Sequence, residues 1–248
     1  MFGWLRRRTA RPIPDAAWHG VLRDFPFLRQ PSAPDDRRLR ELASQFLAHK
    51  EFQGAGGLEI TDHIALAIAA QAVLPVMHLG LRWYDDFVGI VVHPDQVVAR
   101  RTSQDDTGVV HEWDEVLAGE AMERGPVMLS WTDVQAAGAE DGYNVVIHEF
   151  LHKIDMRNGE ADGCPPLPRE RRAAWMRILL AEHEAFREKV VIADRFGGEP
   201  TWLDPYAAEN PGEFFAVAGE AYFVNRARFE REFPALLALF DGFFRPAA

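Results

Sequence analysis

Hydrophobic positions in the first third of the chain recur at helical spacing. Residues 14–28 and residues 35–49 each carry apolar side chains on one face, which predicts two amphipathic helices. Residues 63–74 are apolar nearly all round and end at Pro75. A segment of this kind is typical of a helix that lies across the core, and the proline should end it.

Shorter apolar runs predict strands between these helices and the middle of the chain. Residues 87–93 form a β-branched run, and residues 127–131, which follow a Gly-Pro break, are also expected to form a strand. Short strands are also expected within 52–60 and within 109–122. The polar stretch 95–107 predicts a hairpin or a loop. The strand at 127–131 could either bind an extended peptide by strand addition or be an ordinary interior strand.

The second half of the chain is again helical. Helical periodicity covers 144–157, 168–193, 211–223 and 226–244, with a turn-rich loop at 158–168. We therefore expect an α+β fold in which a small mixed sheet is covered by helices. Residues 1–248 should form one domain, with 1–50 as a helical extension and 51–248 as the core.

The last of these helical segments is rich in aromatic residues and ends in Phe243 and Phe244. These two side chains could pack on the core or form an exposed patch for a partner.

The most informative motif is HEFLH at residues 148–152, an instance of the HExxH pattern. His148 and His152 are four residues apart on a helix, so both imidazoles can reach one metal ion. Glu149 can take a proton from a water molecule at that metal. The plain alternative is a pair of helix histidines beside a surface glutamate. Asp155 continues the polar stripe, while Ile147, Leu151 and Ile154 form an apolar stripe beside it.

The position of a third ligand separates the classes of zinc site. One common class places a glycine three residues after the second histidine and a ligand six residues after it. Asp155 and Asn158 occupy those positions here. A gluzincin-like, thermolysin-type site instead takes a glutamate from a later helix. Glu209, Glu213 and Glu220 lie in or just before such a helix, and Glu213 could alternatively close a capping box with Asn210.

Composition narrows the class of protein. The net charge is −11, which argues against a general nucleic-acid or anionic-membrane surface. Cys164 is the single cysteine, which suits a reducing compartment, and a passive role in its loop is the simplest interpretation. We expect no secretory signal and no membrane span, and therefore a cytoplasmic protein.

Two motifs carry a family resemblance. HEFLHKID at residues 148–155 and YAAENPGEFFAVA at residues 206–218 resemble the Mlc titration factor A family, with further likeness at 58–62, 69–71 and 125–131. That family consists of bacterial cytosolic zinc peptidases whose catalytic core is similar to that of anthrax lethal factor. The likeness extends over most of the chain.

The resemblance implies roles for five residues. His148, His152 and Glu213 would hold one Zn²⁺ per chain, Glu149 would be the general base, and Tyr206 would stabilise the oxyanion. Aminopeptidase-like activity on peptide substrates and a link to the regulation of sugar uptake are also implied. The alternative is a binding protein that sequesters the transcriptional repressor Mlc, with peptidase activity secondary.

Two more carboxylates are candidates for a supporting role. Asp155 and Glu220 could each orient a ligand histidine through its other ring nitrogen. The alternative is that both are ordinary surface or salt-bridge carboxylates.

Overall fold

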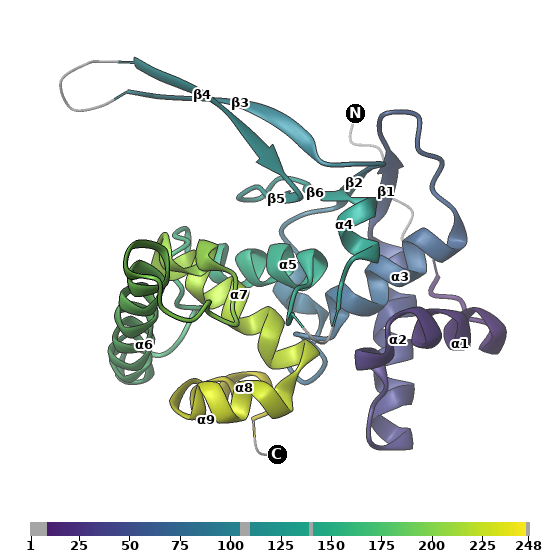
Figure 1. Ribbon diagram of the computed structural model, residues 1–248. Coiled ribbons are helices and arrows are strands. Elements are labelled where there is room, and N and C mark those ends of the chain that lie inside the picture. Colours follow the sequence, from purple (N-terminus) through teal and green to yellow (C-terminus); the bar gives the residue numbers. More distant parts are fainter. Residues whose placement is uncertain (1–8, 105–109, 139–140, 247–248) are drawn as a thin grey trace.

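The computed structural model describes residues 9–104, 110–138 and 141–246. Its first part is helical, as the periodicity predicts. The elements are α1 (Asp15–Asp24), a 3-10 turn (Pro26–Leu28), α2 (Ala33–His49) and α3 (Asp62–Val73). Both α1 and α2 pack against α3, which is buried along almost its whole length and runs through the core (Figure 1).

A four-stranded mixed sheet lies beside these helices. Its order is β1 (Glu51–Gly54), β2 (Gly89–His93), β6 (Val127–Ser130) and β5 (Gly119–Ala121). The first three strands are parallel, and β5 runs antiparallel to β6. Strand β6 is thus interior and β5 is the edge, so the interior interpretation of residues 127–131 is confirmed and the strand-addition alternative is wrong for them.

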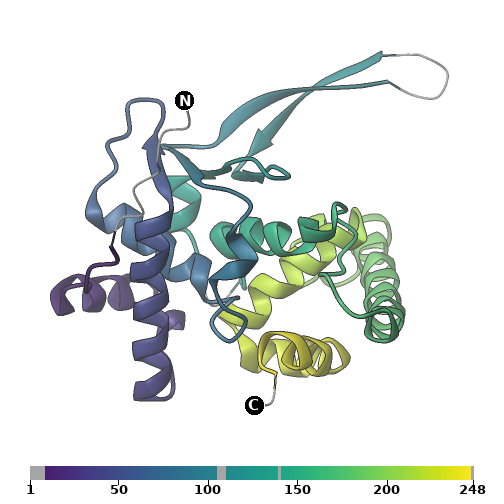
Figure 2. The same cartoon turned by 180° about the vertical axis from the view of Figure 1, so that it is seen from behind.

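The strands expected within 109–122 form, but two parts of the predicted sheet differ from the prediction. Residues 58–60 form no strand, because the chain folds back at Gly54 and the carbonyl of Leu58 packs where a β-carbon on that glycine would stand. Most of 109–122 lies outside the sheet. Strands β3 (Val97–Gln104) and β4 (Val110–Leu117) pair with each other alone, in a long antiparallel ribbon that projects from the body (Figures 1 and 2). The polar stretch after residue 95 is therefore a hairpin, and its segment 105–109 lies outside the described residues.

The remaining helices form the other side of the molecule. They are α4 (Trp131–Gln135), α5 (Val145–Asp155), α6 (Arg169–Phe196), α7 (Pro211–Val224), α8 (Arg226–Glu232) and α9 (Pro234–Phe244). Short 3-10 turns are Leu81–Tyr84, Met156–Asn158 and Pro205–Ala208. The expected helix at 226–244 is two helices, because Pro234 cannot continue α8 and instead begins α9.

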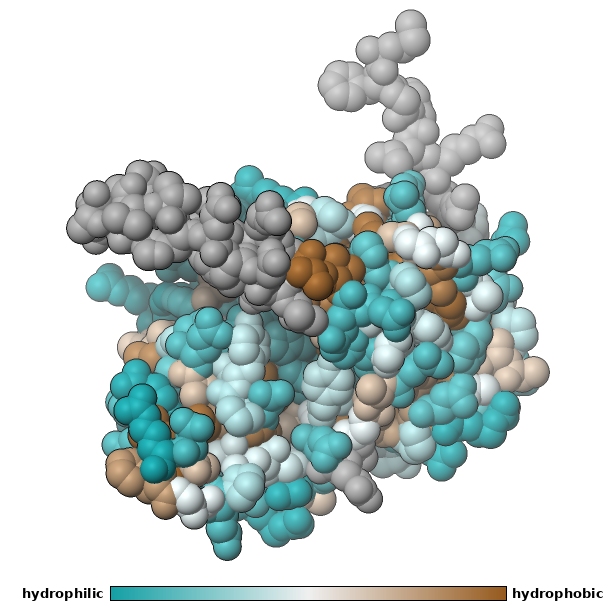
Figure 3. All heavy atoms as spheres, turned by 45° about the horizontal axis from the view of Figure 1, so that its top comes forward, coloured by the Kyte–Doolittle hydropathy of each residue, from teal (hydrophilic) through white to brown (hydrophobic). Residues whose placement is uncertain are grey.

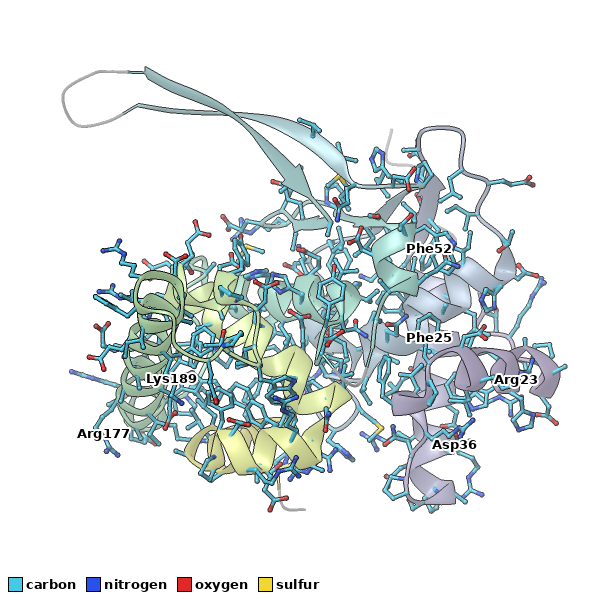
Figure 4. All side chains as sticks on the ribbon, viewed as in Figure 1. Arg23, Phe25, Asp36, Phe52, Arg177 and Lys189 are labelled. Atoms are coloured by element: carbon cyan, nitrogen blue, oxygen red, sulfur yellow. The ribbon has the colours of Figure 1, made fainter. Side chains whose placement is uncertain are left out.

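Helix α6 is the outermost layer on this side. Its buried face carries Trp175, Leu179 and His183, whereas Arg177 and Lys189 lie on its exposed face (Figure 4). Phe243 and Phe244 of α9 are buried and stack among aromatic rings of α6 and α7. The packing alternative for these two residues is thus confirmed, and the exposed-patch alternative is wrong.

The predicted α+β fold, a small mixed sheet covered by helices, is confirmed. Helices α5 and α4 lie directly under β5 and β6, and α7 crosses α5 on the side away from α3 (Figure 1). The face seen in Figure 3 is mainly hydrophilic with small hydrophobic patches. Within the described residues, the helices are too short or too polar to cross a membrane.

Candidate metal centre and active-site cleft

Helix α5 presents two histidines from one face. Its N-cap is Asn144, whose side-chain oxygen accepts a hydrogen bond from the amide of Ile147 at 2.8 Å. His148 and His152 are one helical turn apart, with ring centroids 4.7 Å from each other. The predicted apolar stripe beside them is fully buried, so the helix is anchored in the core, while both rings are only partly buried and His148 lines a cavity.

Helix α7 brings a carboxylate to these rings. Asn210 caps it by accepting a hydrogen bond from the amide of Glu213 at 3.0 Å, which places Glu213 in the first turn. The helix crosses α5 closely because Gly219 leaves room for Leu151, whose Cδ1 would lie 2.2 Å from an added β-carbon. The Glu213 carboxylate is directed at the histidines, and the capping-box contact to Asn210 is not formed.

The three side chains form a compact triangle of donor atoms. His148 Nε2 and His152 Nε2 are 3.1 Å apart, and each is 3.2 Å from Glu213 Oε2. A tetrahedral Zn²⁺ with bonds of 2.0–2.1 Å requires ligand atoms about 3.3 Å apart. The triangle therefore fits a tetrahedral ion of this size, which His148, His152 and Glu213 would hold.

The charges around the triangle favour a bound cation. Burial alone would lower the pKa of His148, but hydrogen bonds to Glu213 and Glu220 outweigh burial and hold that pKa well above its ordinary value. Burial would raise the pKa of Glu213, but its contacts with His148 and His152 outweigh that effect and lower the pKa. Each carboxylate thus stabilises positive charge at the donor atoms, whether carried by a proton or by a metal ion.

Of the two carboxylates expected to orient a histidine, Glu220 makes such a contact. His148 Nδ1 donates to Glu220 Oε1 at 2.7 Å, and this bond leaves the Nε2 lone pair directed at the triangle. Asp155 is differently placed. Its Oδ2 accepts from the amide of Gly163 at 2.7 Å, and its buried Oδ1 has no hydrogen-bond partner. Asp155 therefore fastens the loop that follows α5 and makes no hydrogen bond to either histidine.

Glu149 lies at the wall of the cleft beside the edge strand. Its side chain is 5% exposed, and burial raises the pKa of the carboxyl. A β-carbon added to Gly119 would stand 2.6 Å from Glu149 Oε1 and 2.7 Å from Cγ. Only a glycine at this position of β5 leaves the carboxylate where it is.

Tyr206 lies across the same cleft. It belongs to the 3-10 turn before α7, where its amide donates to Asp204 Oδ1 at 2.9 Å. Its ring centroid is 6.4 Å from that of His148, and its side chain is 44% exposed. A cavity of about 650 Å³ joins His148, Glu149 and Tyr206 and extends toward the base of the β3–β4 ribbon.

Two further histidines and the single cysteine make contacts outside this triangle. His63 approaches Asp24, His183 approaches the carbonyl of Ala208 and stacks near Phe214, and neither is near the triangle. Cys164 is fully buried, its thiol donates to the Pro165 carbonyl, and burial raises its pKa to about 11. A thiol in this state is neutral at pH 7, as the passive interpretation expects.

Sequence reasoning missed three residues that bear on the site. Gly119 was assigned only to a strand, and the roles of Asn144 and Gln71 were not considered. One signal was available for Gln71, which is the single polar residue between Ile64 and Leu74. A polar side chain inside such an apolar helix is buried, and a buried polar side chain needs a partner. No local pattern identifies Gly119.

These features define a class of protein. A helix with two histidines, a glutamate between them at the cleft wall, and a second glutamate supplied by a later helix form a metal-ion site of the metallopeptidase type. Comparison with known proteins agrees. Residues 2–245 match the family described as Glucose-regulated metallo-peptidase M90, and the chain belongs to that family.

Curated relatives support this assignment. Proteins named Mlc titration factor A from Yersinia pestis (strain Pestoides F) and Yersinia pseudotuberculosis (serotype O:1b, strain IP 31758) are 37% identical to it over 231 residues. The match covers 93% of this chain and 84% of each relative.

Proposed function

We propose that this protein is a zinc-dependent, aminopeptidase-like metallopeptidase that holds one Zn²⁺ per chain through His148, His152 and Glu213. The observation that carries the proposal is the triangle of donor atoms, whose edges of 3.1 to 3.2 Å suit a tetrahedral ion. When bound, the ion supplies a Lewis acid that polarises the scissile carbonyl and lowers the pKa of water.

The protein's own residues then move the protons. Glu149 takes a proton from the attacking water at its carboxylate and passes it to the nitrogen of the leaving amine. Burial favours this role because it raises the pKa of the carboxyl, which makes Glu149 a stronger base. Tyr206 donates its hydroxyl proton in a hydrogen bond to the carbonyl oxygen as negative charge develops there. Its exposed position on the opposite side of the cleft suits contact with a substrate.

The edge strand suggests how a peptide would bind. In the β5–β6 pairing, Ser130 N–H donates to Ala118 and Met122 N–H donates to Pro126. With the register Gly119–Leu129, these bonds direct the backbone groups of Gly119 and Ala121 to the outer edge. An extended peptide could pair there beside Glu149, and the cavity of about 650 Å³ suits a short substrate. Strand addition is therefore proposed at β5 and not at β6.

Replacement of the base tests the mechanism. Glu149→Gln should keep the metal, since Glu149 is outside the triangle, and should reduce hydrolysis of short aminoacyl and peptide substrates to the blank rate. Zinc content of the same preparation is measured alongside. Glu184→Gln, an exposed change on α6, is the matched control. Full turnover by the Glu149 variant would refute the assignment.

Metal removal tests the identity of the ion. A chelator should abolish hydrolysis, and Zn²⁺ at one equivalent per chain should restore it. Purified protein that neither contains nor binds zinc would contradict the proposal.

The name of the relatives, Mlc titration factor A, favours a second activity, binding of Mlc. By the family resemblance Mlc would be a transcriptional repressor, and its binding would link the protein to the regulation of sugar uptake in the cytoplasm. Phe243 and Phe244 of helix α9 are buried and cannot supply the contact. Pull-down with purified repressor, using wild type and Glu149→Gln, separates the two activities. Binding by both proteins supports a role independent of hydrolysis. Absence of binding by wild type rejects this second activity.

A further inference from the structure

A buried polar residue on the central helix is connected to the metal centre. Gln71 lies on α3, is 0% exposed, and is surrounded by alanine, valine and leucine positions of its own helix. Burial of an amide among apolar side chains is costly unless its donors and acceptor are used. Gln71 Nε2 donates to the carbonyl of Ala67 at 3.1 Å, which leaves the side-chain oxygen to accept a bond from elsewhere.

That bond comes from the N-cap of the metal-binding helix. Asn144 Nδ2 donates to Gln71 Oε1 at 2.8 Å, and Asn144 is also 0% exposed. The pairing fixes the orientation of the Asn144 amide, because its oxygen must then face the amide of Ile147 and cap α5. A reversed amide would place two acceptors against each other at Gln71 and two donors against each other at Ile147.

The same residue holds the carboxylate that orients His148. Backbone Asn144 N–H donates to Glu220 Oε2 at 2.5 Å, while Glu220 Oε1 accepts from His148 Nδ1 at 2.7 Å. Glu220 is 3% exposed, so both of its oxygens are fixed by these donors and not by water. A continuous set of hydrogen bonds therefore runs from α3, through the start of α5, to α7 and back to a donor atom of the triangle.

We propose that Gln71 is a positioning residue for His148, acting through Asn144 and Glu220. The inference rests on the proposed metal site. Without Gln71 Oε1, the buried Nδ2 group of Asn144 loses its acceptor and has to turn to find another. The cap of α5 and the peptide N–H that holds Glu220 are then displaced together. Glu220 no longer fixes the ring of His148, and the Nε2 lone pair leaves the direction that a metal ion requires.

The test is zinc affinity, measured by competition with a chelating indicator on the full-length protein. Gln71→Met keeps length and apolar volume but removes the acceptor. We expect zinc to bind about tenfold more weakly, at the lower end of the range for outer partners of metal ligands. Tyr84→Phe is the matched control, since it removes a buried hydrogen bond to the α3 carbonyl of Ala72 that does not lead to the site. It should change zinc affinity less than twofold.

A second variant separates positioning from general loss of stability. Asn144→Ser retains a side-chain oxygen that can cap α5 but cannot reach Gln71. Asn144→Ser loses the hydrogen bond that ties the start of α5 to α3, so it should weaken zinc binding, and the double variant should bind no more weakly than Asn144→Ser alone. It also provides the test if Gln71→Met does not fold.

The outcomes distinguish the two proposals. Wild type that binds no zinc would refute the proposed function itself. If wild type binds zinc and the zinc affinity of Gln71→Met is within twofold of the wild-type value, the positioning role alone is refuted. Equal losses in Gln71→Met and Tyr84→Phe, or additive losses in the double variant, would also overturn it.

Discussion

The close contact between Gly119 and Glu149 predicts the effect of a single added methyl group. In Gly119→Ala the new β-carbon would lie 2.6 Å from Oε1, 2.7 Å from Cγ and 2.9 Å from Cδ of Glu149. Ordinary contacts begin at 3.4 Å, so Oε1 has to retreat by about 0.8 Å. The backbone of Gly119 needs no positive φ, so alanine is compatible with the strand itself.

A displacement of this size affects catalysis more than folding or metal binding. Misplacement of a catalytic group by about 1 Å can reduce a rate about 100-fold, which corresponds to about 2.7 kcal/mol of transition-state stabilisation. The three atoms nearest to the added group all belong to Glu149 and none is a donor atom of the triangle, so zinc affinity should stay at the wild-type value. Gly119→Ala should therefore lower the rate of hydrolysis less than Glu149→Gln does, and like that variant it should keep the metal.

The assay compares kcat/KM on a short aminoacyl or peptide substrate with zinc content measured on the same sample. Gly242→Ala is the control, because a β-carbon there meets no atom within 4 Å and the helix α9 lies away from the cleft. If the kcat/KM of Gly119→Ala were within threefold of the wild-type value, the position of Glu149 would not be set by β5. Loss of zinc in parallel with activity would equally refute the reasoning.

Two further predictions concern the hydroxyl of Tyr206 and a buried lysine. Tyr206→Phe should lower kcat by roughly 100-fold, as loss of one oxyanion donor does, while KM and zinc content stay near wild type; an unchanged kcat would remove Tyr206 from the mechanism. Lys50 is largely buried, and this burial lowers its pKa to about 8. Between pH 8 and about 10.5 the unfolded chain therefore binds more protons at this lysine than the folded chain does. The free energy of unfolding of wild type minus that of Lys50→Met should consequently rise with pH across this window, by about 2 kcal/mol from pH 7.5 to 9.5. Urea unfolding of both proteins at the two pH values measures this difference, and a gain that falls with pH would contradict it.

Much of the fold could be predicted because the elements carry local signals. The apolar stripe of α5 and the Asn-Pro-Gly-Glu start of α7 lie within single segments, and both helices form close to where the periodicity places them. The β3–β4 ribbon was harder to assign, because strands that leave the sheet follow no hydrophobic alternation set by a core. The division into an extension at 1–50 and a core at 51–248 stays a prediction.

The residues of the candidate site could also be named from the sequence. His148, Glu149 and His152 follow from one motif, and the structure brings Glu213 to the two histidines and Tyr206 to the cavity that His148 and Glu149 line. Their roles in binding and catalysis stay predictions until the variants are measured. Asp155 continues the stripe of His148 and His152, so the sequence slightly favours it for orienting a histidine, but in the structure Glu220 makes that contact.

What the sequence determined by itself is the set of chemical groups and their local geometry. Four residues make about one turn of helix in any protein, so HEFLH places two imidazoles on one face wherever it folds. Only the tertiary structure decided which distant groups meet them. Glu220 contacts His148 because α7 crosses α5 closely, Gly119 contacts Glu149 because β5 is the edge of the sheet, and Gln71 reaches Asn144 because α3 packs on α5. These distances depend on how the whole core packs, and no spacing along the chain encodes them.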